Sequence, residues 1–127
     1  MRILGIDYGS KRVGIALSDE AGHFAYPYSV IKNTNSLLRE IKEICNKEGV
    51  KKIILGESLD YKGKDNVIMA DIKIFKEALE REVEISVIYE SEMMSTAEAT
   101  RLQGYIDKID ASAAAIILKS YIDKNKA

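Results

Sequence analysis

The first third of the chain contains short apolar runs separated by turn residues. These runs lie at residues 2–6, 13–17 and 25–31. Short apolar runs that alternate with turns are typical of strands in a β-meander, so we expect three antiparallel strands here. The third run carries Pro27, the one proline of the chain. Because proline cannot donate a backbone hydrogen bond, we expect this strand at a sheet edge or at a bulge.

From residue 37 onward, helical spacing of apolar residues alternates with short strand-like runs. The predicted helices run from residue 37 to Gly49, over 67–81, over about 95–104, and from Asp110 onward. The predicted strands between them cover residues 50–55 and 84–89. Strands separated by helices usually pair in parallel. We therefore expect an α/β fold with one five-stranded mixed sheet, its first three strands antiparallel, and helices on both faces.

Composition narrows the classes of protein that this chain can be. A length of 127 residues fits one domain, 1–127, and 46% hydrophobic with 31% charged residues is typical of a globular protein. Nineteen basic and twenty acidic side chains leave a net charge of -1, which argues against a strongly basic nucleic-acid coat. The sequence lacks an apolar run of about 18 residues and a signal-peptide pattern, so we expect a cytoplasmic protein without a membrane partner.

The numbers of cysteine and histidine residues exclude sites that need several of either. Cys45 and His23 are the only residues of their kinds. One cysteine cannot form an internal disulfide framework or a cysteine-based zinc cluster, and one histidine cannot supply a histidine-centred metal site. Catalysis by this chain must therefore use carboxylates, hydroxyls or lysines.

Acidic side chains follow or begin several predicted elements. They are Asp7 after the first strand, Glu57 after the fourth, Glu90 and Glu92 after the fifth, and Asp107 with Asp110 at the start of the last helix. Ligands of open α/β sheets bind at the carboxyl ends of the strands. If the first strand is parallel to the fourth and fifth, these acids meet at one rim of the sheet.

Crowded carboxylates without basic partners repel each other unless they bind cations or their pKa values rise. Oxygen ligands alone suit Mg²⁺ or Mn²⁺, and two such ions about 4 Å apart can promote phosphodiester hydrolysis. Each acid also has a simpler use: Asp7 can accept hydrogen bonds from turn amides, Asp110 can cap its helix, and Glu90 and Glu92 can be solvated loop charges. The shared rim favours the metal-dependent nuclease interpretation.

Residues 5–16, GIDYGSKRVGIA, resemble the opening of the YqgF family, also called RuvX-like. Segments 54–63, 91–99 and 108–118 are similar to three further motifs of that family, in the same order. These proteins are RNase H-like and are linked to Holliday junction resolution and to maturation of the 5' end of pre-16S rRNA. The resemblance extends over essentially the whole chain and implies an RNase H-like fold.

The resemblance also implies roles for particular residues. Asp7, Glu92 and Asp110 match the family's acidic triad, so we expect them to be catalytic and to bind two Mg²⁺ or Mn²⁺ ions. The expected partner is nucleic acid, either an rRNA precursor or branched DNA, with the ribosome or its small-subunit precursor as a further partner. The chain is expected to act as a monomer or a homodimer, and the sequence leaves both open.

Basic and hydroxyl side chains near the expected rim are candidates for phosphate contacts. They are Ser10, Lys11, Arg12, Lys62, Lys64, Thr96, Arg101 and Lys108. Lysines and arginines also serve as ordinary surface charge, and Thr96 can equally cap a helix. Phosphate contacts make affinity fall steeply with salt, which distinguishes the two interpretations.

Three departures from the family motifs keep a second function open. Ser91 replaces the usual aspartate, Met93 the usual arginine, and Glu57 with Ser58 the usual Leu-Pro. They are compatible with a catalytically inactive nucleic-acid-binding or ribosome-binding module of the same fold, and they leave open whether Glu57, Glu90 or Asp107 joins a metal site. An actin-like ATPase, suggested by the turn at residues 7–10, needs two lobes and therefore a longer chain.

Overall fold

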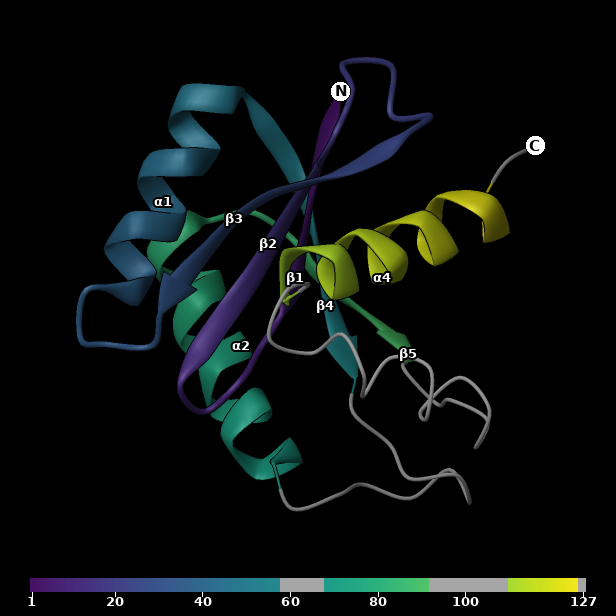
Figure 1. Ribbon diagram of the computed structural model, residues 1–127. Helices are drawn as coiled ribbons and strands as arrows, with labels where there is room; N and C mark the ends of the chain where they lie inside the picture. The colour runs from purple at the N-terminus through teal and green to yellow at the C-terminus, as the bar shows by residue number, and fades with distance from the viewer. Residues whose placement is uncertain (58–67, 92–109, 126–127) are drawn as a thin grey trace, which may run out of the picture.

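The computed structural model describes residues 1–57, 68–91 and 110–125. Its elements are β1 (Arg2–Asp7), β2 (Arg12–Ser18), β3 (Ala25–Lys32), α1 (Leu37–Glu48), β4 (Val50–Glu57), α2 (Met69–Val83), β5 (Val87–Ser91) and α4 (Asp110–Lys124). One sheet joins the strands in the order β3-β2-β1-β4-β5 (Figure 1). None of the helices in these ranges is long and apolar enough to cross a membrane.

Strand directions agree with the expected mixed sheet. β1 pairs antiparallel with β2, and β2 pairs antiparallel with β3. β1 pairs in parallel with β4, and β4 in parallel with β5. The carboxyl ends of β1, β4 and β5 therefore lie at one rim of the sheet, which is the condition that the clustering of acids required.

Two apolar layers cover the two faces of the sheet. On one face, α1 and α2 pack on residues such as Leu4, Ile6 and Ile53. On the other face, α4 packs on a smaller cluster that includes Ile3 and Ile54. Figure 1 shows this division, with α1 and α2 together on one side and α4 lying across the other. Side chains alternate between the two layers along each strand because successive residues of a strand point to opposite faces.

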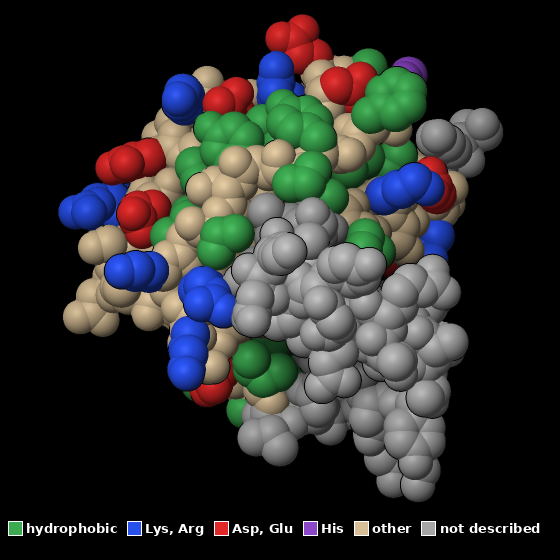
Figure 2. Space-filling view, in the orientation of Figure 1, with side chains coloured by type: hydrophobic (Ala, Val, Ile, Leu, Met, Phe, Trp, Pro, Cys, Tyr) green, Lys and Arg blue, Asp and Glu red, His purple; other side chains and the backbone are tan. Residues whose placement is uncertain are grey.

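The edge strand β3 explains the position of the proline. Pro27 pairs with Ala16, next to a register shift between Ile15 and Ala16, so the expected edge and the expected bulge both occur. Tyr26 and Val30 of this strand are largely exposed. Figure 2 shows hydrophobic side chains gathered over β3 and the turn before it.

The connection from α2 to β5 corrects the expected strand at residues 84–89. Glu84 ends α2 in the left-handed conformation with φ 55°, and its N–H donates to the carbonyl of Glu80 at 3.1 Å. A residue in that conformation cannot continue a strand. β5 therefore begins at Val87 and extends to Ser91, and α2 covers residues 69–83 instead of 67–81. The helix expected at about 95–104 lies outside the described residues.

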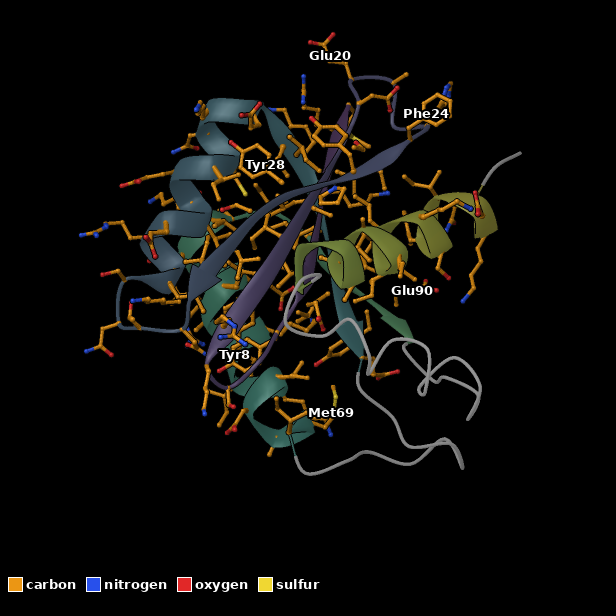
Figure 3. All side chains as sticks on the ribbon, in the orientation of Figure 1. Tyr8, Glu20, Phe24, Tyr28, Met69 and Glu90 are labelled. Atoms are coloured by element: carbon orange, nitrogen blue, oxygen red, sulfur yellow. The ribbon has the colours of Figure 1, made fainter. Side chains whose placement is uncertain are left out.

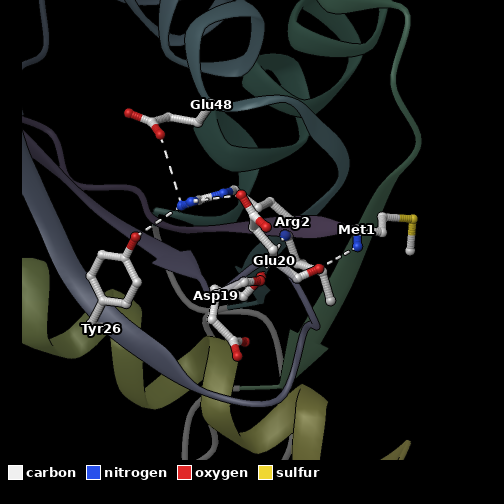
Figure 4. Close-up of polar contacts among 8 residues, drawn as sticks. Met1, Arg2, Asp19, Glu20, Tyr26 and Glu48 are labelled. Carbon is white, nitrogen blue, oxygen red and sulfur yellow. Dashed lines mark hydrogen bonds and ion pairs between the residues drawn. The ribbon is translucent and has the colours of Figure 1, made fainter.

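A polar network closes the rim at the amino end of β1 (Figure 4). The Arg2 guanidinium donates to the Tyr26 hydroxyl at 3.1 Å and forms ion pairs at 3.8 Å with Glu20 and Glu48. The Tyr28 hydroxyl donates to Glu48 at 2.8 Å, and this bond is the main cause that raises the pKa of Tyr28. These groups pair with one another at the end of the sheet opposite the expected site.

Candidate functional site

Asp7 is the last residue of β1 and faces the layer of α4. Its neighbours fix this direction: Leu4 and Ile6 belong to the core under α1 and α2, whereas Gly5 lies against α4. The alternation of side chains along a strand therefore places Asp7 on the face of Gly5. Asp7 is half-buried at the rim where β1, β4 and β5 end.

Glycines stand on both sides of Asp7 in the sheet. Gly14 of β2 is directly opposite Asp7 in the antiparallel pair. Ile6 is paired with Leu55 in the parallel register, so the next position along places Asp7 level with Gly56 of β4. We call Gly14, Asp7 and Gly56 the Asp7 row. Within this row of three strands, Asp7 is the one residue with a side chain.

α4 approaches β1 closely where it crosses Gly5. A Cβ on Gly5 would stand 2.8 Å from the Cβ of Leu118 and 3.0 Å from the carbonyl oxygen of Ala114. Asp110, the first residue of α4, lies four residues before Ala114, which is about one helical turn. The absence of a side chain at Gly5 thus lets α4 begin near the strand that ends in Asp7.

Glu90 has a different environment from the solvated loop charge that the sequence allowed. It is 5% exposed, and its carboxylate accepts hydrogen bonds from the Ser120 hydroxyl at 2.8 Å and from the Lys124 ammonium at 2.6 Å. Figure 3 shows Glu90 between β5 and α4. Burial is possible because both donors come from α4 and compensate the lost hydration. Glu90 therefore connects α4 to the carboxyl end of β5.

Glu57 and Asp7 face opposite sides of the sheet. Glu57 is the last residue of β4 and follows Gly56, which lies level with Glu90 on the α4 face. Successive residues of a strand point to opposite faces, so Glu57 is on the face of α1 and α2. It is half-buried there. This placement separates the Glu57 carboxylate from that of Asp7.

The turn between β1 and β2 carries the described candidates for phosphate contacts. Ser10 and Lys11 are exposed in this turn, and Arg12, the first residue of β2, is exposed directly after it. Asn33 holds the turn in place, because its side-chain amide donates to the Gly9 carbonyl at 2.8 Å and its backbone N–H donates to the Lys11 carbonyl at 2.9 Å. The three candidates therefore lie on an ordered turn after Asp7 or at the first residue of the strand that follows it.

The ring of Tyr8, in the same turn, packs on the other face of the sheet. Its ring lies against Phe75 with centroids 4.7 Å apart. Both rings line a hollow of about 340 Å³ between α1 and α2, to which Asn33, Leu38 and Ile74 also contribute. Asp7 does not line this hollow, which opens on the opposite face of the sheet from the Asp7 row.

Several candidates lie outside the described residues. They are Glu92, Lys62, Lys64, Thr96, Arg101, Lys108, Met93 and Asp107. Ser91 ends β5 and directly precedes Glu92 in the chain. Among the residues that the structure describes, no group of three or more His, Cys, Asp or Glu side chains could hold a metal. The triad of Asp7, Glu92 and Asp110 thus stays a prediction from the sequence.

Neither the glycines beside Asp7 nor the partners of Glu90 were predicted from the sequence. A glycine inside a predicted strand is a signal for close approach of a ligand or of another backbone. Gly14 met that description, whereas Gly56 directly followed the strand predicted at residues 50–55. No comparable signal pointed to Ser120 and Lys124, because 30 and 34 residues separate them from Glu90.

Comparison with known proteins gives one consistent family. A family model described as "RuvX: Holliday junction resolvase" matches residues 1–124. A protein of Maridesulfovibrio salexigens named "Putative pre-16S rRNA nuclease" is 33% identical over 132 residues, covering 96% of this chain and 98% of its own length. A Sulfurihydrogenibium protein of the same name is 34% identical and covers 97% of this chain and 90% of its own length.

Solved structures of low sequence identity share the fold. RuvC of Thermus thermophilus in complex with a Holliday junction substrate matches with a TM-score of 0.62 and 16% identity, covering 98% of this chain and 94% of that chain. The fowlpox virus Holliday junction resolvase matches with a TM-score of 0.57 and 17% identity, covering 98% and 99%. These matches confirm the expected RNase H-like fold.

Proposed function

The chain belongs to the RuvX family, and on this premise we propose that it is a divalent-metal-dependent nuclease that cuts structured nucleic acid, with the 5' end of pre-16S rRNA as its substrate. The observation that carries the proposal is the position of Asp7 at the carboxyl end of β1, on the face of α4 and between two glycines. In an open α/β sheet, this is where a ligand binds. We also propose that residues 1–127 act as one domain in the cytoplasm.

The donor chemistry fits Mg²⁺ or Mn²⁺. Asp7 offers carboxylate oxygens at a half-buried rim, and the chain has a single cysteine and a single histidine. Hard divalent cations prefer oxygen ligands. Asp7, Glu92 and Asp110 would hold the ions. When bound, two such ions activate water and stabilise the leaving oxygen of a phosphodiester.

The residues of the β1–β2 turn would orient the substrate. Lys11 and Arg12 are exposed beside Asp7, so their cationic groups can neutralise phosphates on either side of the scissile bond. Ser10 can donate a hydrogen bond to a phosphate oxygen. Lys62, Lys64, Thr96, Arg101 and Lys108 are proposed for the same task. This arrangement allows a chain of near-zero net charge to bind a polyanion through a local basic turn.

The test compares Asp7→Asn with the wild-type protein on two probes in Mn²⁺: an RNA fragment that spans the 5' end of 16S rRNA, and a four-way DNA junction. We expect the wild type to cut the RNA and Asp7→Asn to lose at least about a hundredfold in rate, while circular dichroism shows the same fold. Asp71→Asn is the matched control, because Asp71 is an exposed aspartate of α2 on the other face. Equal cleavage by Asp7→Asn and wild type would refute the role of Asp7.

A second function is favoured by the replacements Ser91 and Met93 in the family motifs. A binding module without catalysis would bind the same RNA in chelator and would cut neither probe in Mn²⁺. Retention of the RNA by wild type together with complete absence of cleavage selects this alternative over the nuclease. Preferential cutting of the DNA junction would instead keep the nuclease and replace the substrate.

A further inference from the structure

Lys32, the last residue of β3, lies at the same rim of the sheet as Asp7. β3 pairs antiparallel with β2, and β2 pairs antiparallel with β1, so β3 and β1 run in the same direction. The carboxyl ends of β3 and β1 therefore lie at one rim, with β2 between them. Lys32 is exposed at that rim. A cationic side chain is thus placed two strands away from the Asp7 carboxylate.

The side chains of Lys32 and Asp7 lie on the same face of the sheet. Ile31 packs against the core under α1 and α2, and Val13, which is opposite Ile31, belongs to that core. Successive residues of a strand point to opposite faces, so Lys32 and its partner Arg12 are on the face of α4. Asp7 is on that face as well. The two cations therefore lie on the side of the sheet where the proposed chemistry takes place.

The surface between Lys32 and Asp7 is open to solvent at β3. Val30 lies two residues before Lys32 on the same face, opposite Gly14 of β2. Val30 is 44% exposed although it is apolar, so α4 leaves this part of the face uncovered. Strands about 4.8 Å apart that rise about 3.3 Å per residue place the Cα atoms of Lys32 and Asp7 roughly 12 Å apart. A nucleic-acid strand whose scissile bond is at Asp7 can therefore bring a flanking phosphate to Lys32.

Lys32 is opposite another cation instead of an acid. Arg12 is its direct partner in the antiparallel pair of β2 and β3, and both side chains are exposed. Side chains in such positions have Cβ atoms about 4.5–5.5 Å apart, and like charges there destabilise the pair. Elsewhere an exposed cation has an acidic neighbour, as Arg39 has in Glu43 at 3.8 Å. In the part of the chain that the structure describes, the Lys32 ammonium has no acidic partner. Figure 2 shows basic side chains grouped where β3 ends and β2 begins.

Asn33 fixes the end of β3 relative to Asp7. It directly follows Lys32, and its side-chain amide donates to the Gly9 carbonyl at 2.8 Å. Its backbone N–H donates to the Lys11 carbonyl at 2.9 Å. These two hydrogen bonds join the end of β3 to the turn that follows Asp7. Because this backbone is already ordered, a ligand that binds here pays little for ordering it.

We propose that Lys32 and Arg12 together bind a backbone phosphate of the nucleic acid on the β3 side of the scissile bond. The inference rests on the proposed nuclease function and adds to it a binding residue, Lys32, and the side of Asp7 toward which the bound strand extends. A phosphate between the two cations removes their repulsion and accepts charge-assisted hydrogen bonds from the ammonium and the guanidinium. Because phosphate contacts carry no sequence information, this contact adds affinity without selecting bases.

The test measures how tightly the Asp7→Asn protein binds the RNA fragment and the four-way DNA junction in Mn²⁺. Lys32→Gln in this background removes the charge and nearly keeps the length of the side chain. On the probe that binds more tightly, we expect roughly three- to tenfold weaker binding at about 0.1 M salt. The slope of log affinity against log salt concentration should become smaller by about one, because one phosphate contact is lost. Lys32→Arg should restore both values.

Lys51→Gln is the matched control. Lys51 is an exposed lysine of β4 at the opposite end of the sheet, so its replacement should leave the affinity and the salt slope unchanged. Thermal melting without nucleic acid separates binding from folding. Lys32→Gln removes the repulsion from Arg12, so it should melt at the wild-type temperature or up to about 4 °C higher. With Asp7 intact, Lys32→Gln should raise KM for cleavage and leave kcat within about twofold of wild type.

Four results decide the proposal. Weaker binding with a smaller salt slope in Lys32→Gln, restored by Lys32→Arg and absent from Lys51→Gln, supports it. Equal affinity and slope in Lys32→Gln and Lys51→Gln overturn it and leave the nuclease intact, since the wild type still cuts. A lower melting temperature of Lys32→Gln with an unchanged salt slope also overturns it, because Lys32 then serves the fold. A wild-type protein that neither binds nor cuts either probe overturns the nuclease function and this inference together.

Discussion

Replacing Gly5 by alanine tests how closely α4 must approach β1 for the site to form. The new methyl carbon would stand 2.8 Å from the Leu118 Cβ and 3.0 Å from the Ala114 carbonyl oxygen. Carbon atoms in ordinary contact are about 3.5–4.0 Å apart, so α4 has to retreat by roughly 1 Å. Leu118 and Ala114 are fully buried, so the neighbouring side chains leave no space for a smaller adjustment.

The expected cost follows from that displacement. Overpacking a well-packed core by one methyl group destabilises by about 1–3 kcal/mol, and the loss of glycine entropy in the unfolded chain returns about 0.4–1 kcal/mol. A net destabilisation of about 1–2 kcal/mol remains. For 127 residues, an unfolding entropy of about 2.1 cal/mol/K per residue converts this to a melting temperature lower by roughly 4–8 °C.

The assay combines thermal unfolding with calorimetric titration of Mn²⁺. Because α4 begins with Asp110, a helix displaced by about 1 Å should bind the ion at least about tenfold more weakly. Gly49→Ala is the control variant of similar stability loss. Gly49 ends α1 with φ 67°, so alanine is strained there, and an added Cβ has nothing within 4 Å and does not touch α4. Wild-type melting and wild-type Mn²⁺ affinity of Gly5→Ala would refute the argument that this contact sets the position of α4.

Three further predictions concern stability. Burial raises the pKa of the Cys45 thiol to about 11, while the thiol of the unfolded chain ionises near its usual value of about 8.5. The free energy of unfolding should therefore fall as pH rises between these two values. In urea titrations at pH 8 and pH 10, the free energy of unfolding should fall more for the wild type than for Cys45→Ala. Tyr28→Phe removes a hydrogen bond to a carboxylate of α1 and should lower stability by about 1–2 kcal/mol in the same assay, and an unchanged midpoint would contradict this. Lys124→Met leaves buried Glu90 without its cationic partner and should cost about 1 kcal/mol, whereas Lys119→Met, in an exposed pair on the same helix, should cost under about 0.5 kcal/mol.

Much of the fold could be predicted from the sequence because local patterns carry it. The runs at residues 2–6, 13–17 and 25–31 became β1, β2 and β3, and the helical spacing after residue 37 became α1. Pro27 indicated the edge and the bulge because its missing N–H excludes it from a central position. The boundary of β5 was wrong because Glu84 adopts a left-handed conformation that glutamate rarely shows.

The candidate site could be predicted only in part. Asp7 was selected because it shares the expected rim with other acids and matches the acidic triad of the family, and the structure places it at that rim. Glu90 and Glu57 were indistinguishable from it by spacing. The different positions of Glu90 and Glu57 depend on which face of the sheet each side chain points to and on where α4 crosses the sheet. Both depend on contacts between segments that are distant in the chain.

The sequence by itself determined most of the helices and strands, the family and the type of chemistry, because periodicity, composition and short motifs are properties of residues that are close together in the chain. Only the tertiary structure decided which acids share a face. The register of strand pairing places Gly14 and Gly56 beside Asp7, and the alternation of side chains along β4 places Glu57 on the other face. Lys124 of α4 donates a hydrogen bond to Glu90, which lies 34 residues earlier in the chain. These relations arise from pairing and packing between segments distant in the chain, so no single segment encodes them.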